Sequence, residues 1–280
     1  MKVANLAGRL HLITGTGAVD VADASAGRFD PDPARIYGRW REFVAWEREA
    51  ALPRGRAFDP AELGPPTPEP SQLVAIGLNY REHASETGVP APEGLPPVFL
   101  KFRSSLSGPY TTVHLPEGDV DWEVELAVVI GAPADRIGES DAAGVIAGYT
   151  VAQDLSERIL QMAGPAPQFG LAKSHPGFTP LGPWLVTPDE IPDPANLRLS
   201  TLVNGEPVQD CSTRDLLVPV PALIAGISRV ATLYPGDVIL TGTPSGVGMG
   251  RTPSRYLSPG DTLITRIERI GSLRQHFVAA

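Results

Sequence analysis

The segment DWEVELAVVIG, residues 121–131, alternates acidic and apolar residues in a pattern that predicts a β-strand. Because side chains alternate between the faces of a strand, Asp121, Glu123 and Glu125 would share one face. The other face would carry Trp122, Val124, Leu126, Val128 and Ile130. Neighbouring acids would lie about 6.5 Å apart and repel by roughly 2.5 kcal/mol at an effective dielectric of about 20. A bound cation would offset this repulsion. A solvated strand face is the alternative, but the apolar run that follows is expected to be buried.

Similar short runs recur from residue 73 onward and predict further strands between turns. They are LVAIGLNY, PVFLKF, VIAGYTVAQD, PWLVT, LRLSTLVNG, DVILTGTP and TLITRIERIG. The tripeptide PGD, at 235–237 and 259–261, predicts a turn directly before a strand. With 29 glycines and 30 prolines spread along the chain, many turns are expected rather than a helical bundle. The predicted fold class is α+β, mainly β.

The first part of the chain has a different pattern. The stretch ARIYGRWREFVAWEREA, residues 34–50, has helical spacing, and DPAELGPPTPEPSQ, residues 59–72, contains five prolines typical of a linker or extended wrap. We therefore expect a small N-terminal α/β domain with its Pro-rich linker over residues 1–65. A catalytic domain is expected over residues 66–280.

Composition limits the classes of function. The net charge of −9 argues against a nucleic-acid partner, which needs a basic face. The single cysteine, Cys211, excludes an intramolecular disulfide and multi-cysteine zinc sites. No apolar run approaches the roughly 18 residues of a membrane span, and the first residues lack the apolar core of a signal peptide, so a cytoplasmic protein without a membrane partner is expected.

A second acidic position follows the predicted strand in GYTVAQDLSERILQ, residues 148–161. Asp154 would lie at the end of the strand and near the start of a following helix. Arg158 and Gln161, four and seven residues further on, would then lie on the same face of that helix as Asp154. The alternative for Asp154 is a helix N-cap, which is common.

Three further segments carry candidate catalytic groups. In NYREHASETG, His83 and Glu86 are three residues apart, so the glutamate could orient the histidine as a general base on water, within a lid flanked by glycines. A surface pair is the alternative. Lys173, in AKSHPGFTPLGPW, is a candidate electrophile or an ordinary surface lysine. Thr243, in PGDVILTGTPSGVG, could hold a substrate carboxylate.

Taken in order, these segments resemble the fumarylacetoacetate hydrolase family over residues 73–277. The resemblance implies a mixed β-sandwich roll, usually a homodimer. It also implies metal-binding carboxylates at Glu123, Glu125 and Asp154. The metal is typically Mg²⁺, with Mn²⁺ or Ca²⁺ as options that suit all-oxygen ligands.

The resemblance also implies roles for the other candidates. His83 and Glu86 match the lid dyad that activates water, and Lys173 matches the lysine beside the metal. The substrate-contact positions match Arg158, Gln161 and Thr243. The chain departs from the family pattern at Gln153, where asparagine is usual, and at Ala172, where glycine is usual.

The implied activity is hydrolysis of a C–C bond in a β-dicarbonyl keto acid, such as an acylpyruvate or a fumarylpyruvate-like compound. Decarboxylation of a β-keto acid such as oxaloacetate, or enol–keto isomerisation, are alternatives on the same scaffold. A non-catalytic, metal-stabilised binding module is a remote alternative.

Overall fold

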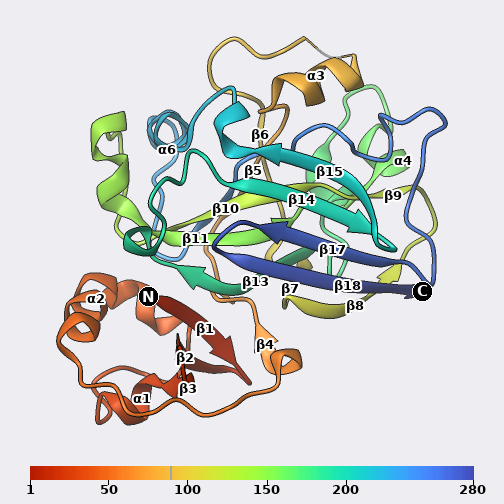
Figure 1. Cartoon of the computed structure of the whole chain (residues 1–280). Coiled ribbons are helices and arrows are strands. Elements are labelled where there is room, and N and C mark those ends of the chain that lie inside the picture. Colours follow the sequence, from red (N-terminus) through yellow and green to blue (C-terminus); the bar gives the residue numbers. More distant parts are fainter. Residues whose placement is uncertain (89) are drawn as a thin grey trace.

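The computed structural model describes residues 1–88 and 90–280, and it has two β-sheets as its main layers (Figure 1). Strands of the two sheets pack on each other: β13 (Thr179–Val186) on β18 (Gly271–Ala279), β11 (Ile146–Gln153) on β17 (Thr262–Ile267) and β10 (Val124–Ile130) on β14 (Arg198–Val203). Within the described residues, no helix is long and apolar enough to cross a membrane. The mainly-β, α+β class expected from the sequence is confirmed.

The large sheet has 11 strands, in the order β3-β2-β1-β13-β11-β10-β16-β5-β6, with β4 beside β1 and β7 beside β13. These strands are β1 (Lys2–Leu6), β2 (Arg9–Thr14), β3 (Gly17–Asp20), β4 (Leu63–Gly64), β5 (Leu73–Ile76), β6 (Val98–Leu100), β7 (Leu106–Ser107), β10 (Val124–Ile130), β11 (Ile146–Gln153), β13 (Thr179–Val186) and β16 (Val238–Leu240). The second sheet has five strands in the order β15-β14-β17-β18-β8. They are β8 (Tyr110–Leu115), β14 (Arg198–Val203), β15 (Glu206–Ser212), β17 (Thr262–Ile267) and β18 (Gly271–Ala279).

Short helices and one two-stranded ladder complete the fold. The helices are α1 (Val21–Ala24), α2 (Trp40–Glu49), α3 (Arg81–Thr87), α4 (Arg158–Gln161), α5 (Phe169–Ala172) and α6 (Val220–Ser228). The ladder pairs β9 (Val120–Asp121) with β12 (Ser156–Glu157). Both PGD turns directly precede a strand, β16 and β17, as predicted, and their glycines have positive φ values of 92° and 98°.

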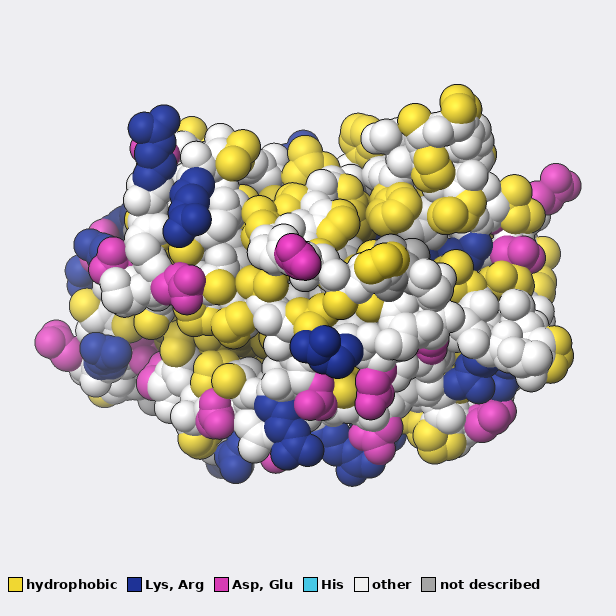
Figure 2. Space-filling view, turned by 90° about the horizontal axis from the view of Figure 1, so that it is seen from above, with side chains coloured by type: hydrophobic (Ala, Val, Ile, Leu, Met, Phe, Trp, Pro, Cys, Tyr) yellow, Lys and Arg dark blue, Asp and Glu magenta, His cyan; other side chains and the backbone are white. Residues whose placement is uncertain are grey.

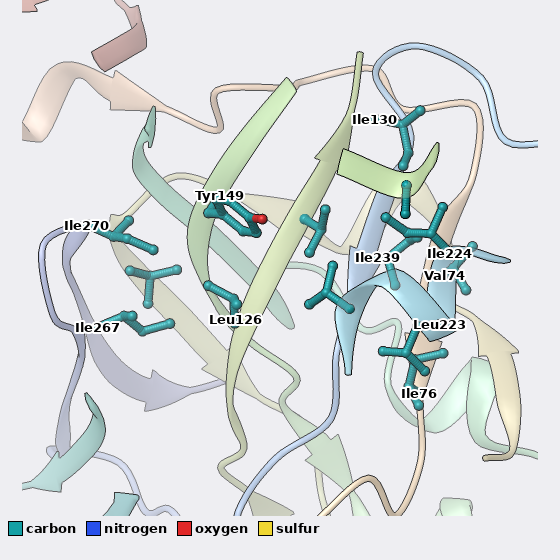
Figure 3. Packing of buried hydrophobic residues seen from close by; sticks show 14 of the residues in the cluster. Val74, Ile76, Leu126, Ile130, Tyr149, Leu223, Ile224, Ile239, Ile267 and Ile270 are labelled. Carbon is teal, nitrogen blue, oxygen red and sulfur yellow. The ribbon is translucent and has the colours of Figure 1, made fainter. Parts of the chain in front are cut away.

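Strand β10 lies near the centre of the large sheet and is buried along its whole length. Its even-numbered residues, Val124 to Ile130, belong to the core cluster that packs against α6 and the second sheet (Figure 3). The odd-numbered Ala127 and Val129 belong to a second cluster, shared with α2 and the first strands. Both faces beyond residue 125 are therefore apolar, because layers cover both sides of the sheet.

The predicted single strand over 121–130 is interrupted. Asp121 belongs to β9, β10 begins at Val124, and Trp122 packs in a separate cluster. The side-chain amides of Gln153 and Gln209 replace the main-chain ladder at the break. Gln153 Oε1 accepts from the backbone N–H of Glu123 at 2.8 Å. Asp121 and Glu125 therefore belong to different strands, not to the one continuous strand that the alternation predicted.

The N-terminal segment contains the helix predicted near residues 34–50. A 3₁₀ turn at Arg35–Arg39 leads into α2, whose aromatic residues pack with Phe29 and Tyr37. Strand β1 pairs antiparallel with β13, so the first strands extend the large sheet. The Pro-rich segment contributes β4, which pairs with β1.

Candidate metal centre and active-site cavity

Three buried carboxylates meet where β10 and β11 lie side by side. Glu123 immediately precedes β10, Glu125 lies within it, and Asp154 follows β11. The strands pair with Val124 opposite Gln153, and Asp154 N–H donates to the carbonyl of Glu123 at 2.9 Å. One oxygen from each carboxylate lies within 4.8 Å of the others. The solvated-face alternative is wrong, because these residues are at most 5% exposed.

Two lysines bind this triad. Lys173, at the end of α5, donates to Glu123 Oε2 and Asp154 Oδ2, both at 2.7 Å. It is 2% exposed, so the surface-lysine alternative is wrong. Lys101, just after β6, donates to Asp154 Oδ1 and to the carbonyl of Phe178. Sequence reasoning assigned Lys101 no role, although a lone charge within the apolar run PVFLKF was an available signal.

Burial and neighbouring charges separate the acidities of the carboxyls. Burial raises the pKa of Glu125 well above its ordinary value, and the nearby charges of Asp154 and Glu123 raise it further. Burial also opposes ionisation of Glu123, but Lys173 and Arg158 outweigh it and lower the pKa of Glu123 to about 2. Burial lowers the pKa of Lys101, with the charge of Lys173 adding to the effect against the attraction of Asp154. For Lys173, the nearby carboxylates outweigh burial and raise the pKa.

Asp121 anchors Arg158 and a loop instead of joining the triad. Its Oδ2 accepts from Arg158 Nε and Nη2 at 2.9 and 2.7 Å. The same carboxylate accepts from the backbone N–H groups of Gly248 and Met249 at 2.6 and 3.0 Å. Arg158 also contacts Glu123 Oε1 at 2.8 Å. Burial opposes the charge of Arg158, but these carboxylates raise its pKa.

The helix that carries Arg158 and Gln161 begins later than the sequence predicted. Strand β12 separates Asp154 from α4, and the N-cap is Glu157, which accepts from two backbone N–H groups at 2.9 and 2.7 Å. The N-cap alternative for Asp154 is therefore wrong. Arg158 Nη1 donates to Gln161 Oε1 at 2.8 Å, which leaves the amide nitrogen of Gln161 as the donor for a ligand.

The histidine pair lies on α3, beside the triad. His83 Nδ1 is 2.8 Å from Glu86 Oε1, and His83 is only 6% exposed, so the surface-pair alternative is wrong. The other oxygen of Glu86 accepts from the backbone N–H of Gly246 at 2.9 Å. The helix is thus attached to the 244–250 loop that also contacts Asp121. This contact positions the imidazole over the site.

Thr243 is buried at the same place, in the loop that follows β16. It accepts a hydrogen bond from Gln209 Nε2 at 2.9 Å. Gln209 Oε1 in turn accepts from the backbone N–H of Val124 at 3.1 Å. Gln153 donates to Thr265 Oγ1 at 2.8 Å, so β17 of the second sheet supports the strand break that carries the carboxylates.

These elements enclose a cavity of about 210 Å³. Six of the nine predicted site residues line it: His83, Glu123, Arg158, Gln161, Lys173 and Thr243. Glu86 lies behind His83, and Glu125 and Asp154 lie behind Glu123 and Lys173. The structure therefore brings all nine candidates into one region, although they come from five separate sequence segments.

The donor set fits a hard divalent cation. The three clustered ligands are all carboxylates, without histidine or cysteine, which suits Mg²⁺, Mn²⁺ or Ca²⁺ more than zinc. Four buried carboxyl groups, counting Asp121, face the three buried cations Lys101, Arg158 and Lys173. Burial first, and then this excess of negative charge, raise the pKa of Glu125, and a bound cation would neutralise the excess.

The fold and site define a family of enzymes with an acidic centre. The model for the C-terminal domain of fumarylacetoacetate hydrolase matches residues 72–278. This chain belongs to the fumarylacetoacetate hydrolase family, as the resemblance implied.

Three related proteins are similar to this chain to different degrees. The human mitochondrial oxaloacetate tautomerase FAHD2A is 47% identical over 208 residues, which cover 74% of this chain and 66% of the human one. The chain thus spans just under two thirds of that relative. A solved structure from Mycobacterium smegmatis is 55% identical with a TM-score of 0.96, covering all of both chains. Maleylpyruvate hydrolase from Sphingobium sp. SYK-6, solved with manganese and pyruvate, is 30% identical with a TM-score of 0.78, again over both full chains.

Proposed function

We propose that this protein is a divalent-metal-dependent hydrolase that cleaves a C–C bond in an acylpyruvate-type β-dicarbonyl acid. The observation that carries the proposal is the His83–Glu86 pair, held at 2.8 Å and facing the same cavity as Glu123 and Lys173. A histidine with a carboxylate partner is the usual means of activating water. The hydrolase relative from Sphingobium supports the assignment, because it was solved with manganese and pyruvate.

Glu123, Glu125 and Asp154 would hold the metal, most simply Mg²⁺ or Mn²⁺. When bound, the metal would supply Lewis-acid stabilisation of negative charge on the keto-acid head of the substrate.

The protein's own residues would perform the remaining steps. The Gln161 amide and the Thr243 hydroxyl would hold the substrate carboxylate and fix its orientation. Lys173 stays protonated, because its pKa is raised, and would stabilise the enolate that forms as the bond breaks. His83 Nε2 would take a proton from water, while its Nδ1–H donates to Glu86 and fixes the tautomer. The hydroxide would attack the distal carbonyl, and the leaving enolate would then be protonated to pyruvate.

A second candidate is oxaloacetate tautomerisation or decarboxylation, which the name of the human relative favours. These reactions use an enolate but no attacking water. The role of His83 therefore separates the candidates.

The test compares the natural protein with His83→Ala on acylpyruvates and on oxaloacetate, each after chelator treatment and after return of Mg²⁺ or Mn²⁺. The hydrolase proposal expects metal-dependent release of pyruvate and a carboxylic acid, reduced by roughly 10²–10⁴-fold in the variant. Metal affinity, measured by calorimetry, should stay unchanged. If only oxaloacetate reacts and His83→Ala keeps the full rate, the tautomerase or decarboxylase is correct.

We also propose a homodimer. Apolar side chains remain exposed on three neighbouring elements, β6, α4 and α5, and include Val98, Leu100, Ile159 and Leu171 at 43–65% exposure. Figure 2 shows hydrophobic side chains gathered on the side of the molecule that carries α3. Exposed apolar groups of this kind suit an interface between subunits. Light scattering at micromolar concentration should give twice the chain mass, and a measured mass of one chain would contradict the dimer proposal.

A cytoplasmic location stays a prediction, since the human relative is named as mitochondrial.

A further inference from the structure

The cavity has one charged wall and one apolar wall. Beside the residues that would bind the acid head, it is lined by Pro97, Phe99, Phe169, Met162 and Met249. These side chains come from the segment around β6, from α5, from the residue after α4 and from the 244–250 loop. The rings of Phe99 and Phe169 meet edge to face, with centroids 5.4 Å apart. Phe99 also lies against the ammonium of Lys173, 5.3 Å from its ring centroid, so the apolar wall begins directly beside the charged one.

The cations that line the cavity are already paired. Among the described lining residues they are Lys173 and Arg158. Lys173 binds two carboxylates of the triad, and Arg158 is held by two hydrogen bonds to Asp121. A second substrate carboxylate, distal to the keto-acid head, would therefore lie against the aromatic and methionine side chains without a cation of its own. Burying an unpaired carboxylate in this way is strongly unfavourable.

We propose that this apolar wall is a distal subsite for an uncharged acyl group, so that the preferred substrate is a monocarboxylic acylpyruvate with an aliphatic or aromatic tail. The proposal rests on the proposed function for the identity of the acid head. It distinguishes this chain from relatives named for oxaloacetate and maleylpyruvate, both of which carry a second carboxylate. The cavity of about 210 Å³ also has to hold the acid head, so the room left for the tail suits a short chain or a single ring.

A matched pair of uncleavable ligands tests the subsite independently of catalysis. N-Butyloxamate and N-(3-carboxypropyl)oxamate share the keto-acid-like head and chain length, and differ only in a terminal methyl or carboxylate. Calorimetry on the Mn²⁺-loaded protein should give at least tenfold tighter binding of the butyl ligand. Lengthening the alkyl chain from ethyl to butyl should tighten binding by about fourfold per methylene. Equal binding, tighter binding of the carboxylate, or no binding of either ligand at millimolar concentration would overturn the subsite.

A charge placed in the wall should change this preference. Met249→Arg supplies a cation to the distal region and should lower the butyl-to-carboxylate affinity ratio at least tenfold. Met249→Leu keeps the wall apolar and should retain the ratio. Val230→Arg adds the same charge at a position that is 90% exposed and does not line the cavity, and should also retain it. An unchanged ratio in Met249→Arg would contradict the location of the subsite.

Turnover separates this inference from the proposed function. The substrates are 2,4-dioxoheptanoate and its distal diacid, 2,4-dioxoheptanedioate. Cleavage of both with preference for the diacid would overturn the subsite and leave the hydrolase intact. Preference for N-butyloxamate without cleavage of any acylpyruvate would reject the hydrolase and retain the subsite.

Discussion

Glu125 should make the metal-free protein less stable as pH rises. Its carboxyl is 1% exposed, beside the carboxylates of Glu123 and Asp154, and it accepts a hydrogen bond from Gly242 N–H at 2.6 Å. Burial and these charges raise its pKa well above the value it would have in the unfolded chain. Between the unfolded and folded pKa values, the folded state binds a proton that the unfolded state has lost. The free energy of unfolding therefore falls with rising pH across this window, by at most about 1.4 kcal/mol per pH unit for one group.

The neighbouring glutamate contributes in the opposite direction and at a different pH. The pKa of Glu123 is lowered to about 2, so its stabilising contribution is fully present above the ordinary glutamate pKa and is lost only below it. Above about pH 5, Glu123 therefore does not change the free energy of unfolding with pH. Of these two glutamates, Glu125 alone makes the stability depend on pH there.

Urea unfolding from about pH 5 to pH 7 in the presence of chelator measures the slope. Glu125→Gln should remove up to about 1.4 kcal/mol per pH unit of pH dependence relative to the natural protein. Glu49→Gln, at an exposed position on α2, is the matched control and should keep the natural slope. Added Mg²⁺ should stabilise the natural protein more at pH 7 than at pH 5, because metal and proton compete for the same carboxylate. Equal slopes for the natural protein and Glu125→Gln would refute the reasoning.

Two further substitutions test the surroundings of the site. Lys101→Met leaves Asp154 with one cation fewer. In denaturant unfolding it should lower the free energy of unfolding by roughly 3–5 kcal/mol in chelator, and by less with Mg²⁺. An equal loss in both conditions would contradict this role of Lys101. Gly248→Ala would place a Cβ 1.9 Å from the carbonyl oxygen of Arg255 and 2.7 Å from Asp121 Oδ1. The loop must then shift, so we expect a loss of about 1–3 kcal/mol in thermal unfolding together with weaker oxamate binding, and an unchanged melting temperature would show that the loop yields freely.

Much of the local structure could be predicted because it depends on nearby residues. The alternation around Leu126, the two PGD turns and the helix near Trp40 all correspond to observed elements. The local sequence pattern did not predict the strand break, where distant side chains replace the backbone hydrogen bonds of the ladder. The break between β9 and β10 depends on amides of Gln153 and Gln209, which are 30 and 85 residues away from the N–H groups they accept from.

The residue types of the site could be predicted from the sequence, but two of the contacts that hold the site together could not. The residue patterns singled out all nine candidates, the resemblance implied their roles, and the structure brings them together around one cavity. Two partners required the fold. Asp121 shares the acidic pattern of 121–125 but binds Arg158, and Lys101 enters the centre from a segment that had indicated only a strand.

By itself, the sequence determined the periodicity of the strands, the positions of the turns, the family and the kinds of groups available for chemistry. The tertiary structure decided which of those groups meet. Pairing β10 with β11 places Glu123 beside Asp154, and α3 and α5 then deliver His83 and Lys173 to the same cavity. Burial and the neighbouring carboxylates raise the pKa of Glu125, because a carboxyl in water and one enclosed among other carboxylates ionise at different pH. Long-range packing sets that environment, and residue order along the chain does not encode it locally.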